Sequence, residues 1–172
     1  MNETLKTLTT RRSVRAYLPD QVKEEDLKQI LEAGTYAPTG MGAQSPVMVV
    51  VQDPETIGQL SRMNAAVMGN NGDPFYGAPT VVVVLADKNR GTCVEDGSLV
   101  MGNLMNAAAS LGVASCWIHR AREVFETPEG KELLKKWGLS DDYIGIGNCI
   151  LGYAKDPLPD PKPRKENYII WA

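Results

Sequence analysis

Five consecutive residues near the N-terminus have the types and spacing to bind a small anion. The segment Arg11-Arg12-Ser13-Val14-Arg15 places an arginine on each side of a hydroxyl, so that all three groups can converge. Arginine offers a planar fork of donors that matches phosphate oxygens. Charge-assisted hydrogen bonds contribute about 1.5–3 kcal/mol each, so two or three supply much of the roughly 8 kcal/mol behind micromolar binding. The segment therefore predicts a phosphate site, and the alternative interpretation is a solvated helix end.

A second basic cluster, Lys162-Pro163-Arg164-Lys165, lies near the C-terminus. It is either a set of solvated side chains in a polar tail or further positive charge for the same anion. Nucleic-acid binding is disfavoured for both clusters, because the chain is acidic, with 18 Lys and Arg against 21 Asp and Glu. In addition, no aromatic residues are interleaved with the basic ones.

Two further segments could bring groups close to a ligand. Residues 37–46 (APTGMGAQSP) combine small residues with Gln44 ahead of an apolar run, which permits close backbone approach, although a structural turn explains them equally well. Residues 115–120 (SCWIHR) leave an apolar run and end in polar groups. There Trp117 is either a core residue or a wall for a stacked ring. His119 is a surface residue, a proton relay or a ligand contact.

Other common chemistries are excluded. The Walker pattern GxxxxGK, the GxGxxG fingerprint and the GxSxG elbow are all absent. His119 is the only histidine, which excludes a His-rich zinc site and gives a Ser-His-Asp triad little support, so no metal site is predicted. Three cysteines without CxxC spacing indicate buried thiols in a reducing, cytoplasmic compartment. No apolar run approaches the ~18 residues of a membrane span, and the N-terminus has no apolar signal core, so no membrane association is expected.

Short apolar runs and amphipathic segments predict the elements that position these groups. The run Thr80–Ala86 (TVVVVLA) is the strongest strand signal, and its continuous apolar character predicts burial on both faces. Gly34 is expected to end a helix, and 64–77 to form a mobile surface loop. Further strands are expected at 47–51, 113–118 and 144–151, and helices at 2–10, 23–34, 54–63, 95–111 and 128–138. Without a regular βαβ rhythm, this layout predicts an α+β fold with a central mixed sheet flanked by helices.

Length and composition predict a single domain, residues 1–172, because 43% hydrophobic and 23% charged residues are ordinary for a globular protein. The segment 153–172 is expected to be a proline-rich arm. Its prolines at 157, 159, 161 and 163 keep it out of a central strand or helix. The arm ends in the apolar sequence YIIWA, which has to be covered, and docking on a partner subunit would cover it.

In their order along the chain, these pieces resemble the nitroreductase family of FMN-dependent oxidoreductases, in its short version. The resemblance covers nearly the whole chain. It rests on Arg11–Arg15, Ala37-Pro38 with Gln44, Phe75-Tyr76-Gly77-Ala78-Pro79, Asp96 seven residues ahead of Asn103, Leu111-Gly112, Gly152-Tyr153 and the basic tail.

The resemblance implies a homodimer with FMN in clefts at the dimer interface. The first arginine segment and the tail would hold the phosphate, and the loop ending at Gln44 would approach the ring or the ribityl chain. The segment from Trp117 would lie beside the isoalloxazine, with a backbone N–H facing the reactive flavin nitrogen. The implied cofactor-binding residues are Arg11, Arg12, Ser13, Arg15, Pro38, Thr39, Gln44, Trp117, Ile118, His119, Arg120, Lys162 and Arg164.

The chemistry that this implies belongs to the cofactor, so no protein nucleophile is expected. NADH or NADPH would reduce FMN and leave, and a small-molecule acceptor such as a nitroaromatic or a quinone would then take the electrons in a ping-pong cycle. The alternatives are a dehalogenase or an ene-reductase of the same fold, a non-catalytic flavin-binding protein, and an anion- or nucleic-acid-binding module. The chain departs from the family at Gly42, where Asn is common, and at Ser45-Pro46, where Pro-Trp is common. The first change implies a lost flavin hydrogen bond or a more open pocket.

Overall fold

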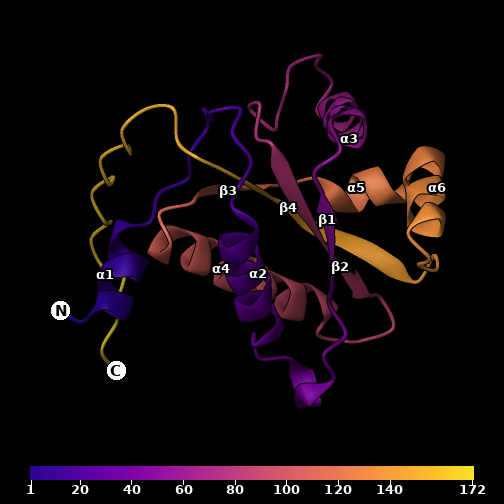
Figure 1. Cartoon of the computed structure of the whole chain (residues 1–172). Coiled ribbons are helices and arrows are strands. Elements are labelled where there is room, and N and C mark those ends of the chain that lie inside the picture. The colour runs from indigo at the N-terminus through magenta and orange to yellow at the C-terminus, as the bar shows by residue number, and fades with distance from the viewer.

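A four-stranded sheet forms the centre of the structure, a computed structural model that describes all 172 residues (Figure 1). Its strands are β1 (Val47–Val51), β2 (Thr80–Asp87), β3 (Ala114–Ile118) and β4 (Tyr143–Gly152), in the order β1-β2-β4-β3. Every neighbouring pair is antiparallel. The prediction of an α+β fold with a central sheet is confirmed, but the prediction of a mixed sheet is wrong. The strands β2 and β3 run the same way, and β4 lies between them, so the two never pair.

Helices cover both faces of this sheet. On one face lie α2 (Glu24–Thr35) and α4 (Cys93–Ser110), and on the other lie α3 (Pro54–Val67), α5 (Ala121–Glu126) and α6 (Pro128–Lys136) (Figure 1). Each face has its own hydrophobic cluster, so β2 between them is buried from Thr80 to Ala86, as its continuous apolar run predicts. The helix α1 (Glu3–Thr10) and the C-terminal tail lie together at one end of the molecule.

The ends of the elements follow from local hydrogen bonds and packing. Asn2 caps α1 by accepting a hydrogen bond from the backbone N–H of Leu5 at 3.0 Å. Gly34 does not end α2, which continues to Thr35. Instead, a Cβ on Gly34 would lie 2.8 Å from the sulfur of Met48, so this glycine lets α2 approach β1.

Three local predictions differ from the structure. The β-branched run at 47–51 predicts a buried strand, but β1 is an edge strand with a neighbour on one side only, and it is only partly buried. The predicted mobile loop 64–77 is wrong in part, because α3 continues to Val67 and the side chains of Asn64 and Phe75 are buried. The helix α5 was not predicted, because six residues are too few to show a helical period.

The tail beyond β4 forms no helix or strand, as its prolines predict. One isolated bridge joins Ala154 to Tyr17, and the apolar residues at the end of the chain are exposed, with 92% of Trp171 accessible. No helix of the structure combines the length and the apolar character that crossing a membrane requires.

The cysteines of the sheet make the stability of the fold sensitive to alkaline pH. All three thiols are free and buried, as predicted. The pKa of Cys149 is raised from 9.0 to about 12, mainly by burial and also by the nearby Cys116 thiol, while Arg11 acts in the opposite direction. Because the unfolded chain ionises first, stability that is fully present below pH 9 is lost as the pH rises toward 12. We expect the melting temperature to fall between pH 9 and 11, with a shallower slope in Cys149→Ala. Equal slopes in thermal melts of the two proteins would contradict this assignment.

Candidate functional site

The first arginine segment lies along the outer edge of β3. The N–H of Arg11 donates to the Thr7 carbonyl at 2.9 Å, which ends α1. Ser13 forms an isolated parallel bridge with Ser115, and the N–H of Val14 donates to the Ser115 carbonyl at 3.1 Å. The backbone of the segment is therefore fixed against β3.

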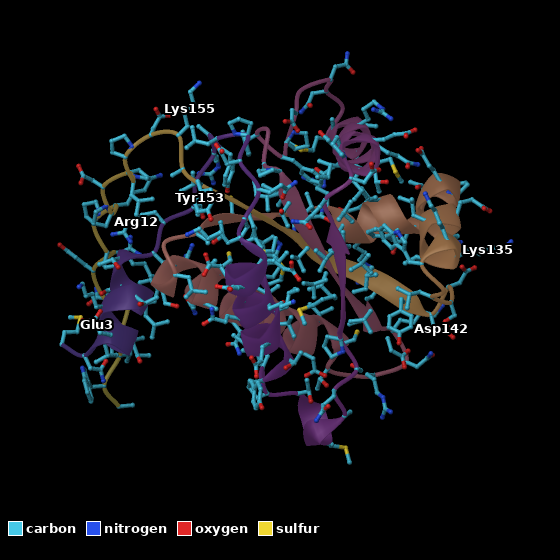
Figure 2. All side chains as sticks on the ribbon, in the orientation of Figure 1. Glu3, Arg12, Lys135, Asp142, Tyr153 and Lys155 are labelled. Carbon is cyan, nitrogen blue, oxygen red and sulfur yellow. The ribbon has the colours of Figure 1, made fainter.

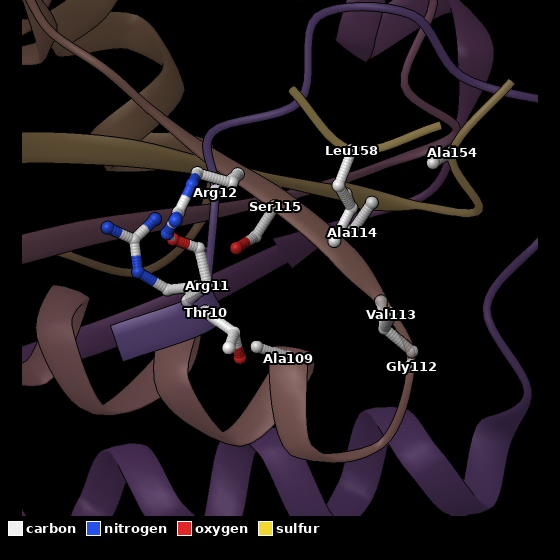
Figure 3. Close-up of a pocket in the computed structure, with 10 residues that line it drawn as sticks. All are labelled: Thr10, Arg11, Arg12, Ala109, Gly112, Val113, Ala114, Ser115, Ala154 and Leu158. Atoms are coloured by element: carbon white, nitrogen blue, oxygen red, sulfur yellow. Dashed lines mark hydrogen bonds between the residues drawn. The ribbon is translucent and has the colours of Figure 1, made fainter. Parts of the chain in front are cut away.

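A cavity of about 200 Å³ lies beside this segment, between the ends of α1 and α4 and the start of β3 (Figure 3). Arg11 and Arg12 approach it from one side, Ser115 from β3, and Leu158 from the tail. Figure 2 shows Arg12 on the same side of the molecule as α1 and the tail, and Lys135 at the opposite side. The remaining lining residues are Thr10, Ala109, Gly112, Val113, Ala114 and Ala154.

Three polar atoms of this cavity lining are buried without a hydrogen-bond partner. They are Nη1 of Arg11, Nε of Arg12 and Oγ of Ser115. Arg12 is otherwise engaged, because its Nη1 donates to the Thr9 carbonyl at 2.9 Å and to the Arg11 carbonyl at 2.7 Å. An unsatisfied buried donor costs about 1–3 kcal/mol, and no carboxylate lines the cavity to receive these three. The arrangement fits an anion with several oxygens, such as a phosphate group.

The other predicted phosphate contacts lie outside this cavity. Ser13 and Arg15 line a separate hollow of about 270 Å³ with Asp156 of the tail. Lys162 and Arg164 are exposed, and the Arg164 guanidinium donates to the Lys162 carbonyl through Nε at 3.2 Å and Nη2 at 2.6 Å. The structure thus brings together Arg11 and Arg12 of the predicted set. It adds Ser115, whose side chain gave no signal in the sequence.

The loop before β1 is held in place by a buried carboxylate of α4. Asp96 is 2% exposed, and its Oδ1 accepts the N–H of Gly40 at 2.9 Å while its Oδ2 accepts the Thr92 hydroxyl at 3.0 Å. Gly40 has no room for a side chain, because Thr92 fills the space where a Cβ would lie. The loop is also closed on itself, since the Gln44 N–H donates to Thr39 Oγ1 at 3.0 Å.

The same loop exposes its tip. Pro38 and Gln44 are exposed, Thr39 is half-buried, and Met41 is fully exposed. Met41, Gly42 and Gln44 have left-handed backbones, with φ of 56°, 66° and 49°. Two of these three residues are not glycine, so part of the loop is in a conformation that L-residues adopt at a cost.

The end of β3 is fixed from the other face of the sheet. The carbonyl of His119 accepts a hydrogen bond from Nδ2 of Asn64 at 2.8 Å. This bond joins α3 to the end of β3. Trp117 is half-buried, and its Nε1 is buried without a partner beside Gly147, which lacks a Cβ. Ile118 is buried, whereas His119 and Arg120 are exposed, and Arg120 has a left-handed backbone with φ of 76°.

Within a single chain, the loop and the cavity lie apart. The loop leads into β1, and the arginine segment is fixed to β3. These are the two edge strands, with β2 and β4 between them. At a strand spacing of about 4.8 Å, the two edges lie roughly 14 Å apart. The two predicted parts of the flavin site are therefore on opposite edges of the same sheet.

Comparisons with known proteins agree with this fold. The model of the nitroreductase family matches residues 8–153. A nitroreductase with bound FMN from Bacteroides fragilis superposes over the full length of both chains with a TM-score of 0.92 and 31% identity. An FMN reductase [NAD(P)H] from Bacillus subtilis is 36% identical over 179 residues, covering 91% of this chain and 68% of the relative. Iodotyrosine deiodinase bound to FMN and 3-iodo-L-tyrosine is 23% identical, with 98% of each chain covered and a TM-score of 0.79, so it shows the shared fold alone. The chain belongs to the nitroreductase family.

Proposed function

We propose that this protein is an FMN-dependent oxidoreductase that takes electrons from NAD(P)H and passes them to a small-molecule acceptor. The observation that carries the proposal is the cavity beside β3, where two arginines and a serine present unpartnered polar atoms to one space. A phosphate monoester carries about 1.5–2 negative charges and three acceptor oxygens, which suits these groups. Relatives that bind FMN or are named for NAD(P)H support the same reading.

FMN, when bound, would supply the hydride and electron transfer between the nicotinamide and the acceptor. The role of the chain is to bind the flavin and to orient it. Arg11 and Arg12 would hold the phosphate, and the loop from Pro38 to Gln44 and the end of β3 from Trp117 to Arg120 would hold the rest of the flavin. The fixed His119 carbonyl keeps this strand end in one position. No protein nucleophile is required.

Donor and acceptor use one site in turn, so we propose ping-pong kinetics. Double-reciprocal plots of initial rate against NAD(P)H at several acceptor concentrations are expected to give parallel lines. Intersecting lines would show that both substrates bind together, which would contradict a single shared site. Nitroaromatics and quinones are the acceptors to test first.

We further propose that the working unit is a homodimer in which the loop of one protomer meets the arginine segment of its partner. The separation of these two parts at opposite sheet edges supports this arrangement. Apolar side chains on α1 and α4 are also exposed: Leu5 and Leu8 at 51% and Leu99 at 46%. In the same proposal, each chain is one domain with a C-terminal arm at 153–172, works in the cytoplasm, and docks its arm on the partner.

Gly102 offers a direct test of the dimer. It lies in α4 with nothing within 4 Å of the position of its missing Cβ, and Gly58 of α3 has only ordinary contact there. Alanine at either position adds about 1 kcal/mol of helix propensity. If α4 packs on a partner, Gly102→Ala weakens dimerisation in analytical ultracentrifugation, whereas Gly58→Ala leaves it unchanged. Equal dimer affinity in both variants would place the interface elsewhere.

The visible absorption spectrum of the purified protein tests the proposed activity. A yellow protein that bleaches on anaerobic addition of NADH or NADPH is the expected result, and the donor that bleaches it is identified at the same time. A yellow protein that neither donor reduces would be a flavin-binding protein without this activity. A colourless protein that takes up no added FMN would overturn the proposal.

A further inference from the structure

Ser115 is a buried serine whose hydroxyl has no use within the fold. It is 2% exposed, and its Oγ has no hydrogen-bond partner. Its carbonyl is already engaged by Val14, so the backbone role of the residue is complete without the side chain. Buried hydroxyls are nearly always hydrogen-bonded in folded proteins, and each exception calls for an explanation. A hydroxyl that the fold leaves unpaired at a cavity wall is available to a ligand.

The surroundings of this hydroxyl define the ligand's chemistry. Figure 3 shows it directed toward the side chains of Arg11 and Arg12, whose Nη1 and Nε are also unpartnered. The rest of the lining is apolar or small, and it contains no carboxylate. Two of the three groups can only donate, so the ligand must supply several acceptor atoms close together. The cavity of about 200 Å³ has room for a tetrahedral oxyanion.

We propose that Ser115 is a phosphate-binding residue, which donates its hydroxyl to one phosphate oxygen of FMN while Arg11 Nη1 and Arg12 Nε bind others. This inference rests on the proposed flavin function. It assigns to β3 a phosphate contact that lies outside the arginine segment. Through this contact, β3 would contribute to the preference for FMN over riboflavin. Riboflavin lacks the phosphate and leaves all three groups unpaired.

The substitution Ser115→Ala isolates this contact, because it removes one oxygen and nothing else. We expect the Kd for FMN, measured by quenching of flavin fluorescence, to rise about tenfold or more, as for a hydrogen bond to a charged group. The Kd for riboflavin is expected to stay the same. Inorganic phosphate should compete with FMN in the wild type and compete less well in the variant. Should the alanine variant be unstable, Ser115→Cys keeps a similar volume with a weaker donor and is expected to shift the ratio the same way.

Ser61→Ala is the matched control. Ser61 is also a buried serine, but its Oγ is engaged with Asp73 Oδ1 at 2.7 Å, away from the cavity. Its removal should lower the melting temperature and leave the ratio of FMN to riboflavin affinity unchanged. If Ser115→Ala weakens both flavins equally, or neither, the inference is overturned while the flavin function stands. A wild type that binds neither flavin would instead overturn the proposed function itself.

Discussion

Replacing Arg11 and Arg15 together with alanine is expected to abolish the retention of FMN through purification. Each guanidinium that binds a phosphate contributes about 1.5–3 kcal/mol, or about 10- to 100-fold in affinity. The double variant should therefore bind FMN at least about 10- to 100-fold more weakly, because Arg11 lines the phosphate cavity. The measurements are the ratio of flavin to protein absorbance after gel filtration and the Kd of the apoprotein for added FMN.

The single variants separate the two arginines. Arg11 lines the cavity with an unpartnered Nη1, whereas Arg15 is exposed and lines a different hollow with Asp156. Arg11→Ala is therefore expected to account for most of the loss. Arg62→Ala removes an exposed arginine of α3 and controls for the change in net charge. Unchanged FMN occupancy in the double variant would rule out the phosphate assignment.

Much of the fold can be predicted from the sequence, because burial imprints a pattern on it. The run Thr80–Ala86 shows its burial on both faces directly, and the amphipathic period of α2 places Leu27 and Ile30 in the core. The direction of a strand relative to its neighbours leaves no such pattern in the sequence. The antiparallel order follows from the insertion of β4 between β2 and β3, which is decided by contacts between distant segments. The same holds for Gly34, which looks like a helix end but is a packing contact.

Less of the candidate site than of the fold can be predicted from the sequence. Residue type and spacing alone predict Arg11 and Arg12 as anion contacts, although a solvated helix end explains the same residues. Ser115 cannot be found this way, since a serine inside an apolar strand has no chemical signature until a cavity and two arginines lie beside it. Asp96 enters the sequence argument only through a family resemblance. The structure shows its physical role: its carboxylate accepts a hydrogen bond from the N–H of Gly40, 56 residues away in the sequence.

Removing the Asp96 carboxylate is expected to loosen the loop that approaches the flavin. Asp96→Ala leaves the Gly40 N–H and the Thr92 hydroxyl without their acceptor in a buried position. The loss of two hydrogen bonds to a charged group, at about 1.5–3 kcal/mol each, should lower the free energy of unfolding by about 3–6 kcal/mol. Because the loop tip also has left-handed residues that tertiary contacts must hold, FMN affinity should fall about tenfold as well. Urea denaturation of the apoprotein and FMN titration measure the two effects separately.

Asp96→Asn and Asp53→Ala show whether the two effects share a cause. The asparagine keeps an oxygen for the Gly40 N–H, so FMN affinity should stay near that of the wild type. Asp53 caps α3 by accepting the Thr56 N–H at 2.8 Å, and its removal should lower stability without changing FMN affinity. If Asp96→Ala loses stability yet binds FMN like the wild type, the carboxylate serves the fold alone. The loop from Pro38 to Gln44 would then contribute nothing to flavin binding, and the contacts on the phosphate and at the end of β3 would have to hold the cofactor by themselves.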